Sequence, residues 1–116
     1  MTVELDIWVR GTPDARTHRV ELAPASAGEW RESDVHRLMS EMLLALNRET
    51  NPDAEPPPVA MRGFSWIVSP YESGVVVHVE MQIGTVSAGP LAIDEARLTA
   101  LISRVMKNDE PAASVH

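Results

Sequence analysis

The stretch Asp94-Glu95-Ala96-Arg97-Leu98-Thr99 is similar to an earlier one, Asp34-Val35-His36-Arg37-Leu38-Met39, at an offset of sixty residues. Each begins with an aspartate, whose charge is favourable at the positive end of a helix dipole. Each then continues with apolar residues at helical spacing. The tripeptide Ser-Ala-Gly precedes both copies, at 26–28 and 87–89. We interpret this as two copies of one strand–strand–helix unit. The alternative is that two amphipathic helices simply look alike.

Four other segments alternate apolar and polar residues with the period of a half-buried strand: 3–10, 16–22, 64–69 and 75–83. Ser33 is the expected N-cap of the first helix, which should end near Arg48, and Asp94 opens the second. One ββα unit is too small to bury its apolar side alone. We therefore predict an α+β, two-layer ββα-ββα sandwich, in which a four-stranded, mostly antiparallel sheet carries both helices on one face.

The chain length of 116 residues predicts one domain. That domain should span 1–110, as halves 1–48 and 62–107. The linker between them, 49–61, contains four of the nine prolines, which favour extended backbone. Residues 108–116 are expected to form a flexible tail.

The charge balance of ten basic and seventeen acidic residues gives a net charge of −7. Such a chain repels phosphate backbones, so duplex nucleic acid is not expected as a partner. No apolar run approaches the roughly 20 residues of a membrane helix, so no membrane partner is expected either. Cysteine is absent, which excludes disulfides and thiolate zinc sites. The acidic N-terminus does not resemble a secretory leader, so we expect a cytoplasmic protein.

Catalytic signatures are missing: the sequence has no glycine-rich phosphate loop, no GxSxG and no HExxH. We therefore expect neither an enzyme nor a cofactor. His78 and Glu80 lie two apart on one predicted strand and could begin a metal site. Glu4, Asp6 or Glu21 could supply a third ligand. Solvated strand residues explain the same pattern, so no metal is assigned.

The sheet face without helices should carry mostly polar side chains, but Trp8, Ile67 and Val76 are exceptions. An exposed tryptophan with aliphatic neighbours and a charged surround is typical of a protein interface. The alternative is that Trp8 packs under a loop. The predicted partner-binding residues are Trp8, Arg10, Arg19, Ile67, Val76 and His78.

These observations favour a non-enzymatic protein-interaction module. It would either form a homodimer or bind and neutralise another protein, as immunity proteins, antitoxins and phage-encoded inhibitors do. One alternative is a small metal-binding protein or enzyme centred on His78 and Glu80. Another is a structural subunit of a larger assembly such as a virion.

Overall fold

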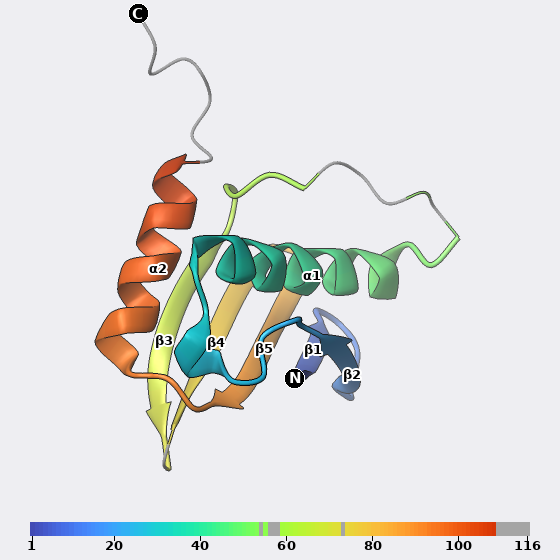
Figure 1. Ribbon diagram of the computed structural model, residues 1–116. Coiled ribbons are helices and arrows are strands. Elements are labelled where there is room, and N and C mark those ends of the chain that lie inside the picture. The colour runs from blue at the N-terminus through green and yellow to red at the C-terminus, as the bar shows by residue number, and fades with distance from the viewer. Residues whose placement is uncertain (54, 56–58, 73, 109–116) are drawn as a thin grey trace, which may run out of the picture.

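Five antiparallel strands form one sheet in the order β2-β1-β5-β4-β3 (Figure 1). This computed structural model describes residues 1–53, 55, 59–72 and 74–108. The strands are β1 (Thr2–Val9), β2 (Arg16–Glu21), β3 (Ser65–Tyr71), β4 (Gly74–Met81) and β5 (Gly84–Leu91). The other described elements are α1 (Glu32–Thr50), α2 (Glu95–Asn108) and a 3₁₀ turn (Ala27–Glu29). The predicted α+β class is confirmed, whereas the predicted number of four strands is wrong.

The strand β5 is the one that the sequence pattern misses. Glycine and proline are depleted in strand interiors, so Gly84 and Gly89-Pro90 indicate that no strand follows the predicted one over 75–83. In the structure Gly84 begins β5 and pairs with Val9 and Met81 on its two sides. A β-carbon at Gly84 would overlap the carbonyl oxygen of Trp8, so close approach of the backbones explains the glycine.

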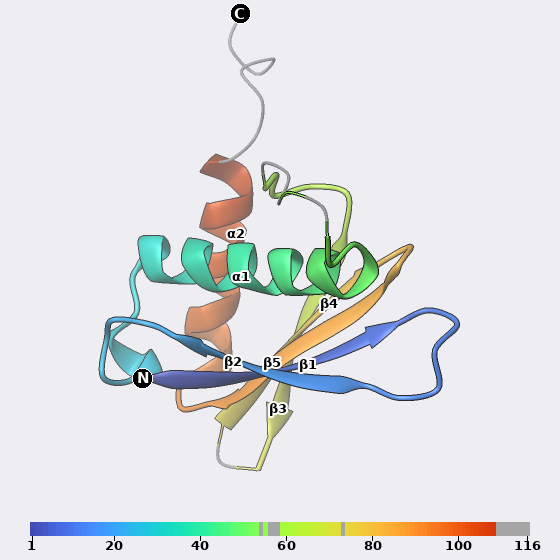
Figure 2. The ribbon, with the colours of Figure 1, turned by 90° about the vertical axis from the view of Figure 1, so that its right-hand side faces the viewer.

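Both helices lie on the same face of the sheet, as predicted (Figure 2). Helix α1 packs on β1 and β5, and α2 packs on β3 and against α1. The buried side chains are apolar, and no polar or charged side chain is buried in the described part of the chain. The strands contribute buried residues at alternate positions: Val3, Leu5, Ile7, Val68, Val75, Val77, Val79, Val86 and Ala88. The sheet therefore has a covered face and an open face.

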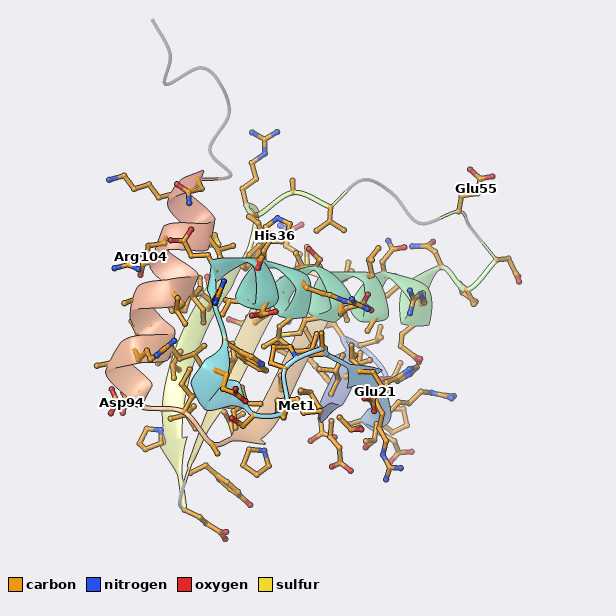
Figure 3. All side chains as sticks on the ribbon, viewed as in Figure 1. Met1, Glu21, His36, Glu55, Asp94 and Arg104 are labelled. Atoms are coloured by element: carbon orange, nitrogen blue, oxygen red, sulfur yellow. The ribbon has the colours of Figure 1, made fainter. Side chains whose placement is uncertain are left out.

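The starts of the two helices show how far the internal similarity extends. Arg31, not Ser33, is the N-cap of α1, and Asp34 accepts a hydrogen bond from the backbone N–H of Arg31 at 2.9 Å. Asp94, at the start of α2 in Figure 3, accepts one from the backbone N–H of Arg97 at 3.2 Å. The two aspartates therefore satisfy amide donors from different helix positions. The structure does not confirm a duplicated unit.

The connections around the helices differ slightly from the predicted boundaries. Helix α1 continues to Thr50, inside the range predicted as linker, and Asn108 is the last residue of α2 rather than the first of a tail. The run Pro56–Pro58 and residues 109–116 lie outside the described residues. Before α1, Trp30 is fully buried, and its carbonyl oxygen accepts a hydrogen bond from Arg97 Nη2 at 2.7 Å. The loop before α1 is therefore attached to α2.

The end of α1 is attached to the edge strand β2 by polar contacts instead. Glu49 lies within 2.8 Å of His18 Nε2 and within 3.2 Å of Arg16 Nε. The side chain of Glu49 is only 18% exposed. A carboxylate at a helix C-terminus opposes the helix dipole, so these two partners offset an unfavourable position.

Candidate functional site

One row of side chains crosses all five strands on the open face. The strand register places Thr17, Asp6, Ser87, His78 and Ile67 side by side in that order. Thr17 Oγ1 donates to Asp6 Oδ1 at 3.0 Å, and His78 Nδ1 lies 2.8 Å from Ser87 Oγ. The row therefore runs from polar, hydrogen-bonded side chains on β2 and β1 to an apolar side chain on β3.

The β1–β2 side of the open face is charged. Arg19 Nη2 lies 3.5 Å from Glu4 Oε2, and the hydroxyl of Thr2 contacts the carboxylate of Glu21. Across the five strands, the described residues of this face include four carboxylates, those of Glu4, Asp6, Glu21 and Glu80, but one arginine, Arg19. The open face is therefore net acidic.

The β3 side of the same face is apolar. Ile67 is 59% exposed and Tyr71 is 50% exposed, and they are the two most exposed of the large hydrophobic side chains in the described chain. Strand β3 carries no charged residue between Ser65 and Tyr71. Exposed hydrophobic residues scattered singly are ordinary, but these two lie four positions apart on the same face of one strand, with only Ser69 between them on that face. We call Ile67 and Tyr71 the β3 strip.

A bulge in β5 hollows the open face beside the β3 strip. Val75 pairs with Leu91 and Val77 with Ala88, so two residues of β5 lie opposite one residue of β4. Bulges of this kind bend a strand and redirect its side chains.

The two residues of β5 in the bulge are Gly89 and Pro90, and they lie opposite Val76 of β4. Gly89 contributes no side chain to the open face, which leaves a depression there. Its volume is about 410 Å³. We call this depression the bulge pocket; its lining includes Glu4, Asp6, Tyr71, Val76, His78, Ser87, Gly89 and Pro90.

The six predicted partner-binding residues lie in three separate places. Ile67, Val76 and His78 come together, because Ile67 pairs with His78 across β3 and β4, and Val76 and His78 both line the bulge pocket. Arg19 lies on the edge strand β2, beside Glu4. The structure therefore brings three of the six into one place.

Trp8 and Arg10 lie at the other end of β1. Trp8 is half-buried, and its Nε1 donates to the carbonyl oxygen of Thr12 at 3.0 Å, so it packs back on its own hairpin loop. Arg10 Nε donates to the carbonyl oxygen of Gln82 at 2.9 Å. Trp8 is hydrogen-bonded to the β1–β2 turn and Arg10 to the β4–β5 turn. Neither side chain lines the bulge pocket.

His78 and Ser87 form a hydroxyl–imidazole pair, which in hydrolases can activate a serine nucleophile. Such catalysis also uses a group that orients the imidazole and donors that stabilise an oxyanion. In the described residues no carboxylate is hydrogen-bonded to His78, and Asp6 flanks Ser87 from the opposite side. Ser87 itself lies in the paired part of β5, between Asp6 on one side and His78 on the other. The pair is best described as a cross-strand hydrogen bond.

His78 and Glu80 share one face of β4, as predicted. However, no group of three or more His, Asp or Glu side chains in the described ranges could hold a metal ion. The suggested third ligands Glu4 and Asp6 are on β1, which β5 separates from β4, and Glu21 is one strand farther away.

Sequence reasoning misses three features of this site. Tyr71 lies beyond the predicted strand 64–69, and Ser87 and Gly89 lie beyond the predicted strand 75–83, so none of the three is placed in the predicted sheet. The alternation of Thr85 and Ser87 with smaller apolar residues is the signal that would have indicated a fifth strand.

Comparisons with protein-family models, with curated proteins and with solved structures find no match to this chain. Neither described helix combines the length and the apolar character that crossing a membrane requires. The geometry of the open face is therefore the basis for proposing a function.

Proposed function

We propose that this chain is a non-enzymatic interaction module that binds a protein partner through the open face, on the side formed by β3, β4 and β5. The observation that carries this proposal is the β3 strip: Ile67 and Tyr71 are exposed on an uncharged strand, next to the bulge pocket. Protein interfaces typically combine an apolar centre with a polar rim. Here the acidic residues of β1 and β4 supply that rim.

The partner could be a second copy of this chain or a different protein, and the charge of the open face favours a different protein. Two open faces brought together would place acidic groups opposite acidic groups, which is unfavourable. A different protein with a basic surface complements the same face. By covering that surface the module would neutralise its partner, which is how an immunity protein, an antitoxin or a phage-encoded inhibitor acts.

The test compares two exposed isoleucines. Ile67 is on the β3 strip, and Ile83, which is 39% exposed, is at the β4–β5 turn beside α1. Tagged wild-type protein, Ile67→Ser and Ile83→Ser are used to capture partners from the native cell, and light scattering gives the mass of each. Burying an isoleucine contributes about 1.5–3 kcal/mol, so we expect Ile67→Ser to weaken binding at least about tenfold and Ile83→Ser to retain it.

Ile67→Ser should unfold within about 0.5 kcal/mol of the wild type, because Ile67 is mostly exposed. Ile83→Ser should lose about 1 kcal/mol, because Ile83 is partly buried beside α1, and the domain should remain folded. Equal capture of the same protein by all three chains would contradict the proposal. So would a monomeric wild type that captures no protein in stoichiometric amount. A dimer that Ile67→Ser dissociates would place a second copy of the chain on the open face instead.

A further inference from the structure

We infer that the bulge pocket receives an arginine side chain from a basic protein partner. This inference rests on the proposed function, because it assigns a chemistry to one part of the same surface. It depends on three features of this one depression: the carboxylates of β1, an aromatic ring, and side chains that can form hydrogen bonds.

The charge comes from β1. Glu4 and Asp6 both line the bulge pocket from the same strand. Asp6 Oδ1 accepts a hydrogen bond from Thr17, which leaves its second oxygen as an acceptor. Paired carboxylate oxygens are the acceptors that a guanidinium group binds best.

Two rings also line the bulge pocket. Tyr71 comes from β3 and is half-exposed, and Pro90 comes from the bulge of β5. A guanidinium group is planar and stacks on aromatic rings, whereas a lysine ammonium is a compact, strongly hydrated charge. Carboxylates together with an aromatic ring therefore favour arginine over lysine.

Hydrogen-bonding side chains line the bulge pocket as well. Ser87 and His78 contact each other, and Gly89 lines the pocket without adding a side chain. The volume of about 410 Å³ is that of a small ligand site. An arginine head group is smaller than this, so it can enter together with part of its aliphatic stem.

The chain already contains one competitor for these carboxylates. Arg19 Nη2 lies 3.5 Å from Glu4 Oε2, with 72% of the arginine side chain exposed. An exposed contact of this length is weak, so a partner's arginine can displace it at little cost. Replacing Arg19 should therefore strengthen arginine binding, whereas removing a carboxylate should weaken it.

The test uses N-acetyl-arginine amide as the probe and N-acetyl-citrulline amide, its neutral near-isostere, as the control. Each is titrated into full-length ¹⁵N-labelled protein and followed by NMR. We expect the arginine probe to bind in the millimolar range and to shift the amides of Asp6, His78, Ser87 and Gly89. The citrulline probe should shift them much less at the same concentration.

Three variants locate the charge that matters. Asp6→Asn should weaken the arginine probe about two- to five-fold, and Arg19→Gln should strengthen it by a similar factor. Glu80→Gln removes the same charge from the same face outside the bulge pocket, and should change the affinity little. Asp6→Asn keeps the acceptor for Thr17, so the fold should be retained.

Two results would overturn the inference. One is that arginine and citrulline probes shift the same amides equally, or that neither shifts them. The other is that Glu80→Gln weakens the arginine probe as much as Asp6→Asn does, which would show a general attraction to an acidic face. Either result leaves the proposed function to be decided separately, by the comparison of Ile67→Ser with Ile83→Ser.

Discussion

The two faces of the sheet are built by the same five strands, yet they carry opposite kinds of side chain. On the covered face alternate residues are aliphatic and buried beneath α1 and α2. On the open face the alternate residues of β1 and β2 are mostly polar or charged, whereas on β3 uncharged serines alternate with the exposed Ile67 and Tyr71. Antiparallel sheets with one solvated face normally have polar residues there. The β3 strip departs from that rule, and stability of the fold does not explain the departure.

The largest difference in the free energy of unfolding should be found between variants of two neighbouring residues of β1. Leu5 is fully buried on the covered face, and Glu4 is more than half exposed on the open face. Leu5→Ala should lower the free energy of unfolding by about 2–5 kcal/mol, because it removes packed methyl groups and leaves a cavity. Glu4→Ala should change it by no more than about 0.5 kcal/mol.

Urea unfolding followed by tryptophan fluorescence measures both variants. Equal losses for Leu5→Ala and Glu4→Ala would contradict the assignment of the two faces. A domain of this size is stabilised by only about 5–15 kcal/mol in total, so the loss expected for Leu5→Ala is large enough to measure clearly.

A smaller effect should come from the polar end of the covered face. Glu49→Gln removes the charge that contacts His18 and Arg16 and keeps the side-chain shape. Arg16 is largely exposed and His18 is partly exposed, so we expect a loss of about 1 kcal/mol at low salt. Salt screens such contacts, and the loss should shrink in ~1 M NaCl.

Thermal unfolding of the wild type and Glu49→Gln at low and high salt checks this. If the loss is the same at both salt concentrations, the contact is held by packing and not by charge. If Glu49→Gln loses as much stability as Leu5→Ala, the distinction between the apolar and polar parts of the covered face fails.

The covered face was predictable from the sequence because burial leaves a periodic signal. Val3, Leu5 and Ile7 alternate with polar residues, and such alternation specifies both a strand and the side that faces the core. The helix stripes do the same at their own period. The strand β5 was not predictable in this way, because Gly84, Gly89 and Pro90 are present for close backbone approach and for a bulge.

The open face was predictable only in part. The alternation places Ile67, Val76 and His78 on it correctly. The bulge pocket depends on which strands are neighbours, and strand order leaves no trace in a single sequence. Trp8 shows the same limit, because its hydrogen bond to Thr12 is a property of the folded hairpin loop and not of the residue type.

Site-specific photocrosslinking can show directly whether a protein partner contacts the β3 strip, as we propose. A photoreactive p-benzoylphenylalanine replaces Ile67 in one chain and Ile83 in another, and each is irradiated in the native cell. We predict a discrete crosslinked protein, different from this chain, from position 67 and none from position 83. The same crosslinks from both positions, or none from position 67, would contradict the claim.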